Sequence, residues 1–278
     1  MKIAIASGKG GTGKTTVATN LALSIGSCQF IDCDVEEPNA NIFIRAEIKE
    51  SEDVTMNIPE IDKMKCDYCG KCSDFCIYNA IAVVPSSVLV FPELCHSCGG
   101  CEIVCPKNAI NWYKRIVGKV EHGQVKEIDF YQGILNVGEM QAVPVIKSLK
   151  SKVDKNKNVI IDIPPGTSCP VIESIGGSDY CILVTEPTPF GLHDLKLAVE
   201  VVSHLNIPFG VIINRDGIGD KKVETYCQNE NIAILLKIPE KRTIAHLYSK
   251  GIALVNESYE WHEMFGQVFN RIQNEVKK

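Results

Sequence analysis

The stretch Gly8-Lys9-Gly10-Gly11-Thr12-Gly13-Lys14-Thr15-Thr16 decides the fold. It fits the pattern G-x-x-x-x-G-K-[ST] completely, and this pattern describes a glycine-rich loop that binds phosphate groups. The apolar run Ile3-Ala4-Ile5-Ala6 precedes it, and apolar residues at helical spacing follow it from Val17 to Ile25. We therefore predict a strand, a phosphate-binding loop and a helix, in preference to an ordinary glycine turn before a helix.

Each residue type in this loop has a physical task. The glycines permit positive φ, so that successive backbone N–H groups turn inward around an anion, and the helix N-terminus adds positive potential. Lys14 is predicted to reach the β- and γ-phosphates of a nucleotide, and the Thr15 hydroxyl is predicted to bind Mg²⁺. Lys9 is a second lysine, and binding of the β- and γ-phosphates does not explain it because Lys14 already has that role. The alternative is that Lys9 is a solvated surface residue. The predicted nucleotide-binding residues of the loop are Gly8, Lys9, Gly10, Gly11, Thr12, Gly13, Lys14, Thr15 and Thr16.

The composition is that of a globular protein. The 278 residues are 45% hydrophobic and 23% charged, which fits one large or two modest domains. The formal net charge is −5, and an acidic protein is not attracted to the phosphates of nucleic acid or of anionic lipid. We expect protein partners or small anions, no nucleic acid and no stable membrane association.

Whether the cysteines bind metal or form disulfides depends on the cellular compartment of the protein. No apolar run approaches the roughly 18 residues of a membrane span, because the uncharged stretch Ile77 to Pro92 is broken by Pro85, Ser86 and Ser87. The only apolar N-terminal run is followed too closely by glycines and Lys9 for a signal peptide. We therefore expect a cytoplasmic protein, in which the thirteen cysteines indicate metal binding rather than disulfides.

Acidic residues follow two later apolar strands. Asp34 comes shortly after the run 29–31, and Asp162 ends the run 159–161, before Pro164-Pro165-Gly166. Parallel strands end at one edge of a sheet, so both carboxylates are placed to contact Mg²⁺ or the attacking water, although a polar loop is the alternative. We predict a Mg²⁺ site at Thr15 and Asp162. The predicted catalytic residues are Lys9, Lys14, Asp34 and Asp162.

Further residues near strand ends are candidates for nucleotide contacts. Asn214 follows the apolar run 208–213 and either reads the N6/N7 side of adenine or is an ordinary loop asparagine. The predicted contacts of this kind are Asn39, Asn214, Arg215 and Pro239.

Two cysteine runs repeat along the chain. Cys66-x-x-Cys69-x-x-Cys72-x-x-x-Cys76 is followed by Cys95-x-x-Cys98-x-x-Cys101-x-x-x-Cys105-Pro106. This spacing is typical of bacterial ferredoxins with two [4Fe–4S] clusters, in which the last cysteine of each run ligates the other cluster. Zinc is the alternative, but four cysteines in one short run exceed the usual pattern of two spaced pairs. The predicted ligand sets are Cys66, Cys69, Cys72 and Cys105 for one cluster, and Cys95, Cys98, Cys101 and Cys76 for the other.

The alternation of strands and helices predicts the main fold. Apolar strands are expected at 159–163, 179–185, 208–214 and 232–238, which indicates an α/β, doubly wound, mostly parallel sheet with its ligand at the carboxyl edge. Residues 1–58 and 113–278 are predicted to form this discontinuous P-loop ATPase domain. Residues 59–112 are predicted to form an inserted small α+β bacterial-ferredoxin-like domain.

Three further expectations concern segments outside these motifs. The connection 53–64 is expected to be a strand or linker that breaks at Pro59. Short alternating segments between Trp112 and Gln132, such as 116–120 and 125–128, suggest a small antiparallel hairpin that leads back to the main sheet. The apolar stripe of a C-terminal helix is expected to dock on the core rather than to target a membrane, because glutamates offset its basic residues. Cys28, Cys181 and Cys227 are expected in the core, whereas Cys33 and Cys169 lie in loops that would sense the nucleotide.

The motifs together resemble a known family. Lys9 to Thr16, Asp32-x-Asp34 with Asn39, Asp162-x-Pro-Pro-Gly and Ile213-Asn214-Arg215 are similar to those of the deviant-Walker-A ATPases, which include MinD, ParA, Mrp-type cluster carriers and the nitrogenase iron protein. More narrowly, the chain resembles MinD-superfamily ATPases with an inserted ferredoxin domain.

The resemblance implies roles that the spacing alone does not. It implies an ATP-dependent homodimer in which Lys9 reaches the partner's phosphates. It also implies that Asp34 positions water, that Asp162 holds Mg²⁺ through water and that Asn214 contacts the base.

The first functional hypothesis is a Mg-ATPase, slow without its partner. Its ATP or ADP state would control electron transfer from two [4Fe–4S] clusters, or assembly of a cluster or metallocofactor on a protein partner. The alternatives are a ferredoxin-type electron carrier with ATP as a regulatory ligand only, and a MinD-like positioning ATPase.

Overall fold

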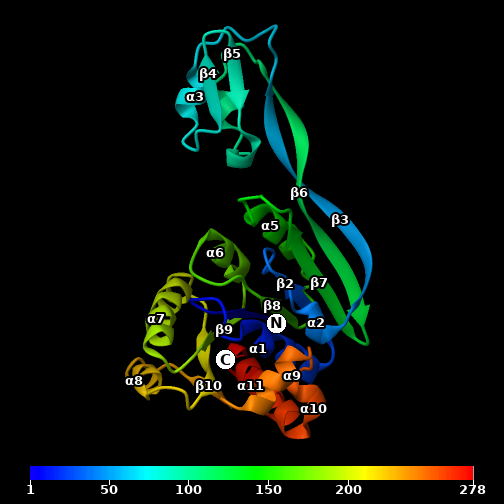
Figure 1. Cartoon of the computed structure of the whole chain (residues 1–278), viewed down its shortest axis with the longest axis vertical. Coiled ribbons are helices and arrows are strands. Elements are labelled where there is room, and N and C mark those ends of the chain that lie inside the picture. The colour runs from blue at the N-terminus through cyan, green and yellow to red at the C-terminus, as the bar shows by residue number, and fades with distance from the viewer. Residues whose placement is uncertain (278) are drawn as a thin grey trace.

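A nine-stranded sheet forms the body of the molecule in the computed structural model, which describes residues 1–277 (Figure 1). Seven neighbouring strands run parallel, and two longer strands join one edge antiparallel. The predicted α/β fold with a mostly parallel sheet is therefore confirmed. In spatial order the strands are β11 (Ile234–Pro239), β10 (Phe209–Asp216), β9 (Tyr180–Thr185), β1 (Lys2–Ala6), β8 (Val159–Asp162), β2 (Cys28–Asp32), β7 (Ile128–Leu135), β6 (Ile110–Val125) and β3 (Glu47–Ile61).

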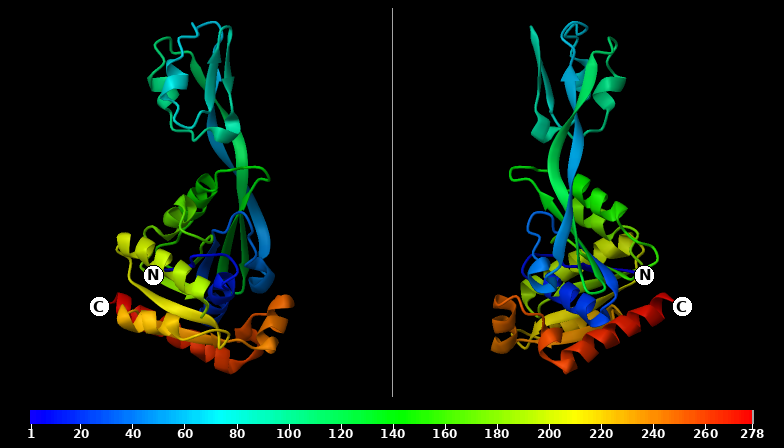
Figure 2. Two further views of the ribbon diagram at one scale, coloured as in Figure 1. Left: turned by 60° about the vertical axis from the view of Figure 1, so that its left-hand side comes forward. Right: turned by 90° about the vertical axis from the view of Figure 1, so that its right-hand side faces the viewer.

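Helices cover both faces of this sheet (Figures 1 and 2). Side chains alternate along a strand, so Ile3 and Ile5 of β1 join one apolar cluster, and Ala4 and Ala6 join the other. The face of Ile3 and Ile5 is covered by α1 (Lys14–Ile25), α2 (Asn41–Ile44), α10 (Leu254–Glu257) and α11 (Tyr259–Val276). The opposite face is covered by α5 (Val143–Ser151), α6 (Cys169–Ile175), α7 (Pro189–His204) and α8 (Lys222–Asn229). Helix α9 (Arg242–Ser249) precedes α10.

The C-terminal helix docks on the core, as its apolar stripe predicts. Phe265, Val268 and Ile272 of α11 are buried in the same cluster as Ile3 and Ile5. None of the helices in the described chain is both long and apolar enough to cross a membrane. Cys28, Cys181 and Cys227 are also buried, as expected for small core residues.

A smaller unit, which we call the tip (residues 62–109), projects from the far ends of β3 and β6 (Figure 1). Its two-stranded sheet pairs β4 with β5 antiparallel and is separate from the main sheet. The elements of the tip are α3 (Lys71–Phe75), β4 (Ile81–Val84), β5 (Ser87–Val90), a 3-10 turn η1 (Pro92–Leu94) and α4 (Gly100–Ile103).

One local expectation is wrong and a second is confirmed with a different position for its turn. The chain does not break at Pro59, because β3 runs without interruption from Glu47 to Ile61. This strand is the edge of the sheet, where proline does not remove a hydrogen bond to a neighbouring strand. The expected antiparallel hairpin is present, since β6 pairs with β7, and β7 joins the main sheet beside β2. The segment 125–128 is the turn of this hairpin, because Val125 pairs directly with Ile128.

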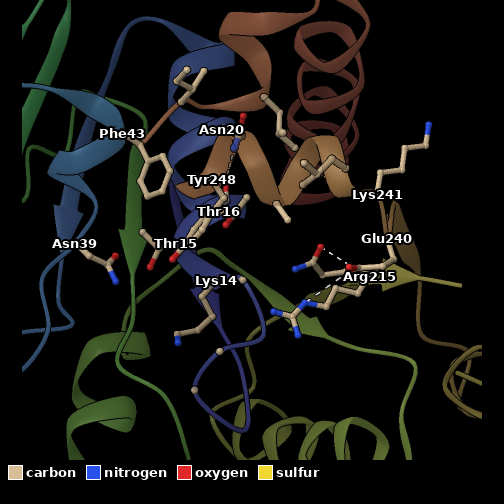
Figure 3. Close-up of a pocket in the computed structure, with 18 of the residues that line it drawn as sticks. Lys14, Thr15, Thr16, Asn20, Asn39, Phe43, Arg215, Glu240, Lys241 and Tyr248 are labelled. Carbon is tan, nitrogen blue, oxygen red and sulfur yellow. Dashed lines mark hydrogen bonds and ion pairs between the residues drawn. The ribbon is translucent and has the colours of Figure 1, made fainter. Parts of the chain in front are cut away.

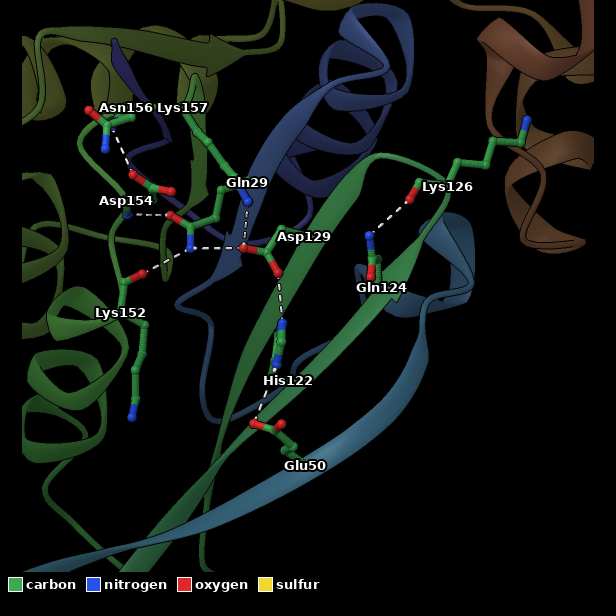
Figure 4. Close-up of polar contacts among 10 residues, drawn as sticks. All are labelled: Gln29, Glu50, His122, Gln124, Lys126, Asp129, Lys152, Asp154, Asn156 and Lys157. Carbon is green, nitrogen blue, oxygen red and sulfur yellow. Dashed lines mark hydrogen bonds and ion pairs between the residues drawn. The ribbon is translucent and has the colours of Figure 1, made fainter.

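A polar network connects β2, β7 and β6 near the amino ends of β2 and β7 (Figure 4). The carboxylate of Asp129 contacts the Nε2 atom of His122 at 2.7 Å and accepts hydrogen bonds from Lys157 Nζ at 3.2 Å and Gln29 Nε2 at 3.5 Å. Gln29 is almost fully buried and also donates to the carbonyl oxygen of Lys152 at 2.9 Å. The network thus fixes the strands from which the ribbon β3–β6 departs.

We expect Asp129→Ala to lower the free energy of unfolding by about 1–3 kcal/mol, because the change removes the acceptor for three polar groups. Urea denaturation measures the effect. Asp53→Ala, at an exposed position of β3, is the control and should shift the free energy by less than about 0.5 kcal/mol. Equal losses in the two variants would contradict a structural role for the network.

Candidate functional site

The glycine loop follows β1 and leads directly into α1. Gly11 and Gly13 have φ values of 77° and 92°, which side chains with a Cβ atom adopt rarely. A Cβ atom on Gly13 would also collide with the side-chain amide of Asn214, and one on Gly8 would collide with the backbone of Asp194. Glycine is therefore favoured at positions 11 and 13 by the positive φ. It is also favoured at positions 8 and 13 because α7 and β10 approach the loop closely there.

A pocket of about 400 Å³ opens beside this loop (Figure 3). Its wall contains Lys14, the predicted phosphate ligand, and Thr15, the predicted Mg²⁺ ligand, together with Asp34. The other predicted residues in its wall are Gly10, Gly11, Gly13, Thr16, Asn39, Asn214, Arg215 and Pro239. Gly8, Lys9 and Thr12 belong to the same loop but contact Asp194, Glu186 and Asn214 instead.

One end of the pocket is apolar, which the sequence analysis missed. The rings of Phe43 and Tyr248 lie with their centroids 5.1 Å apart, and Ile244 and Leu254 extend the same wall. Ile244 and Tyr248 are four residues apart on α9, so their helical spacing is the only sequence signal for this wall.

Asn214 supports the loop rather than pointing freely into the pocket. Its Nδ2 atom donates to the carbonyl oxygen of Thr12 at 2.8 Å, and its Oδ1 atom accepts from the N–H of Arg215 at 2.9 Å. Both polar atoms of the amide therefore have a partner in the chain.

Two carboxylates are completely buried under the loop. Asp32 and Asp162 are neighbours in the β2–β8 register, and each has an exposed fraction of 0%. Asp32 accepts hydrogen bonds from the N–H groups of Asp34 and Ala40, both at 3.1 Å. Within residues 1–277, neither carboxylate oxygen of Asp162 has a hydrogen-bond partner, and such a group is costly unless a cation or proton compensates it. Asp162 beside Thr15 therefore fits a Mg²⁺ site.

Burial dominates the acid–base properties of these carboxyls. It raises the pKa of Asp162 to about 7 and that of Asp34 to about 6, and Lys14 offsets part of each rise. Burial also raises the pKa of Asp32, with the charge of Asp162 as the next cause. A cation bound beside these three carboxyls at neutral pH would therefore stabilise their charged forms.

Glu186 is a second residue that the sequence analysis missed. Its carboxylate is nearly buried, with 8% of the side chain exposed, and it contacts Lys9 Nζ at 3.0 Å and Arg215 Nη1 at 3.2 Å. It directly follows the apolar strand β9, just as Asp162 ends the apolar strand β8. This position at a strand end is the sequence signal that could have identified it. Lys9 is therefore held against its own chain, away from the pocket wall.

The eight repeated cysteines lie in the tip and form two groups around two pockets. Cys66, Cys69, Cys72 and Cys105 line one pocket, which we call the first cysteine set. Cys76, Cys95, Cys98 and Cys101 line the other, which we call the second cysteine set. No group of three or more His, Cys, Asp or Glu side chains in the described chain is arranged around a single metal-ion position.

The repeat in the cysteine spacing is also a repeat in the backbone. Ala80 N donates to Cys76 Sγ and Ala109 N donates to Cys105 Sγ, both at 3.3 Å. Positive φ values recur at matching positions, which are Tyr68, Gly70 and Asn79 in the first run and Ser97, Gly99 and Asn108 in the second. Burial raises the pKa of the Cys101 thiol to about 11, so binding of a metal there would release a proton.

The remaining two cysteines that the sequence analysis singled out have different environments. Cys33 is fully buried beside the nucleotide pocket, and burial raises the pKa of its thiol far above the usual value. Cys169 is exposed at the start of α6.

A family comparison agrees with this architecture. The family model described as the CobQ/CobB/MinD/ParA nucleotide binding domain matches residues 3–255. The chain belongs to this family. The predicted P-loop, nucleotide-binding character of this MinD/ParA-type chain is thereby confirmed.

Two relatives and one solved structure are similar to most of the chain. An uncharacterized protein of Methanocaldococcus jannaschii is 31% identical over 280 residues, which cover 98% of this chain and 96% of its own. A protein of Pyrococcus horikoshii named as an iron-sulfur cluster carrier is 23% identical, covering 100% of this chain and 87% of its own. The septum site-determining protein MinD of Pyrococcus horikoshii, solved with Mg-ADP, is similar in fold with a TM-score of 0.58 and 21% identity, over 96% of this chain and 93% of its own.

The raised pKa of Asp34 predicts a pH dependence of stability in Mg²⁺-free protein. A carboxyl whose pKa rises from 3.8 to about 6 on folding stabilises the fold while it is neutral. This contribution is fully present below about pH 4 and is lost as the pH rises through about 6. Denaturation in EDTA at a series of pH values should therefore show the Asp34→Asn variant gaining stability relative to the unmodified protein across this interval. A difference that is independent of pH would contradict the assigned pKa.

Proposed function

We propose that the chain binds and hydrolyses Mg-ATP and holds two [4Fe–4S] clusters in the tip. Its nucleotide state would control either electron transfer or the assembly of an iron-sulfur cluster or metallocofactor on a partner protein. In this proposal residues 59–112 are an inserted ferredoxin-like domain within the P-loop ATPase domain formed by 1–58 and 113–278.

The observation that supports this proposal most strongly is the sorting of the cysteines. The spacing assigns Cys105 to the first set and Cys76 to the second, although each belongs to the other run in sequence. The pockets contain the same two sets. Four thiols around a pocket suit a cluster of several atoms, and the N–H···S hydrogen bonds at Cys76 and Cys105 are of the kind that tune cluster potentials. The name of the Pyrococcus relatives agrees with iron-sulfur chemistry.

The nucleotide chemistry is assigned to residues of the pocket. Lys14 would bind the β- and γ-phosphates, and Thr15 and Asp162 would hold Mg²⁺, which supplies charge stabilisation for phosphoryl transfer. Asp34 lies in the pocket wall, where its carboxylate would orient the attacking water. The apolar wall formed by Phe43 and Tyr248 would bind the base.

A homodimer is part of the proposal because Lys9 has no phosphate task in its own chain. Lys9 pairs with Glu186 at 3.0 Å, and this pair would have to open before Lys9 reached the nucleotide of a second subunit. Hydrolysis would then be slow in the isolated chain. The two other proposed interactions are with ATP or ADP and with a redox or cofactor-accepting protein.

Two alternatives make different predictions. If ATP is only a regulatory ligand of an electron carrier, a non-hydrolysable ATP analogue would support turnover of the partner as well as ATP does. A positioning role like that of MinD is not favoured, because the apolar side chains of α11 are packed on the core and the net charge is −5.

Lys14→Ala should lower the ATPase rate by about 100-fold or more, because the lysine charge stabilises the transferring phosphoryl group. Phosphate release, measured with MgATP in excess, tests this. Lys147→Ala, at an exposed position of α5, should retain the rate. An ATPase rate that survives Lys14→Ala would refute the catalytic assignment.

Protein purified without oxygen should contain about eight iron and eight sulfide per chain, as two [4Fe–4S] clusters require. Cys69→Ser and Cys98→Ser should each reduce the iron content by about half, because each removes one ligand from a different set. Cys169→Ser is the matched control, since all three cysteines are exposed but Cys169 belongs to neither set. Iron-free protein, or an equal loss in all three variants, would contradict the cluster assignment.

A further inference from the structure

The tip is connected to the body by the two strands β3 and β6. Strand β6 pairs with β7 only over Gly118–Val125. Beyond this point β3 and β6 pair with each other alone, from Thr55 and Ile116 to Ile61 and Ile110 (Figure 2). An isolated two-stranded ribbon is a weak structure in water, so contacts between the tip and the body decide how the tip is held.

One loop of the body makes polar contacts with the tip beside the second cysteine set. We call residues 136–141, between β7 and α5, the bracing loop. Gln141 Nε2 donates to the carbonyl oxygen of Cys95 at 2.8 Å. Arg115 of β6 contacts Glu139 of this loop at 2.6 Å and Glu93 of the tip at 3.5 Å. Glu139 has 8% of its side chain exposed, so the ion pair is shielded from water.

Apolar contacts reinforce the same connection. Cys95 and Ala80 of the tip are buried in the cluster that contains Ala142 at the start of α5 and the core residues of the main sheet, and Cys76 packs against it. A separate small cluster at the junction of the tip with the ends of β3 and β6 contains Cys101 of the second set, and Cys72 and Cys105 of the first set pack against it. The second cysteine set is therefore joined to the body through Cys95 and Cys76, whereas the first set contributes no cysteine to the cluster of the main sheet.

The other end of the bracing loop reaches the nucleotide site. Leu135, which directly precedes the loop, donates its N–H to the carbonyl oxygen of Val35 at 2.8 Å, and Val35 is adjacent to Asp34. The packing is tight, because a Cβ atom on Gly133 would lie 2.6 Å from a methyl group of Val35. A displacement of the Asp34 loop therefore moves the end of β7 with it.

We propose that the bracing loop transmits the nucleotide state of the Asp34 loop to the second cysteine set within one chain. Gln141 is a positioning residue in this route, because it holds the Cys95 loop by its carbonyl group. The first cysteine set would not respond. The inference rests on the proposed function, and it assigns to the two sets different roles that the symmetric cysteine spacing does not suggest.

Hydrogen exchange of backbone amides, followed by mass spectrometry, tests the route in the full chain. The amide of Ser97, which donates to Cys95 Sγ at 3.4 Å, makes the segment 95–98 a reporter. Saturation with MgADP or with a non-hydrolysable ATP analogue should change exchange there by about fivefold or more, whereas segment 66–70 should not change. The iron-loaded and the metal-free protein are both measured, so that the readout does not depend on activity.

Substitutions in the bracing contacts test whether the response travels through them. Gln141→Glu keeps the size of the side chain but removes the donor, and Arg115→Met breaks the ion pairs with Glu139 and Glu93. Both should abolish the nucleotide response at 95–98 while nucleotide affinity, measured with a fluorescent ATP analogue, stays unchanged. Lys107→Met, which removes an exposed ion pair with Asp67 at 3.6 Å beside the first set, should retain the response.

Each outcome has a defined meaning. No response at 95–98 in the unmodified protein with nucleotide bound, a full response in Gln141→Glu, or equal responses in both cysteine segments would overturn the inference. Iron counting is independent of these results. Protein with two clusters but no response refutes the route alone, whereas a response in protein that contains no iron even when purified without oxygen supports the route and refutes the proposed function.

Discussion

The burial of two carboxylates at the carboxyl edge of a parallel sheet is the constraint on which the rest of the molecule depends. Asp32 and Asp162 end neighbouring strands and have no access to water. Asp32 is satisfied by backbone N–H groups, whereas Asp162 is not satisfied by any group in the described chain. A cation bound between this carboxylate, Thr15 and the phosphates would compensate the charge, and fold stability would then be linked to nucleotide binding.

Much of the fold and of the nucleotide site could be predicted because both depend on local patterns. The glycine loop, the apolar strands and the residues directly after them are short-range features, and they place Lys14, Asp34 and Asp162 at one edge of the sheet. The sorting of the cysteines into two sets also followed from spacing alone. Pro59 was misinterpreted because a strand tolerates proline only at a sheet edge, and edge position is a property of the assembled sheet.

The features that could not be predicted join residues far apart in sequence. In the sequence, nothing distinguishes Glu186 from other acidic residues that follow a strand. Its role depends on the contacts with Lys9 and Arg215, which form only in the folded chain. Gln141 and Cys95 are separated by 46 positions, and no periodicity or motif relates them. The cysteine repeat even suggests two equivalent sites, and only the position of the tip on the body makes them unequal.

The exposed edge of β3 has a consequence for how copies of the chain meet. A long strand at the margin of a sheet offers unpaired backbone groups to any other strand, and such edges promote aggregation. Here Pro59 interrupts the row of N–H donors near one end, and Glu47, Lys49, Glu50 and Glu52 are charged near the other. The protein can therefore extend a thin ribbon into solvent without inviting a second ribbon to add to it, which leaves the tip free to meet other molecules.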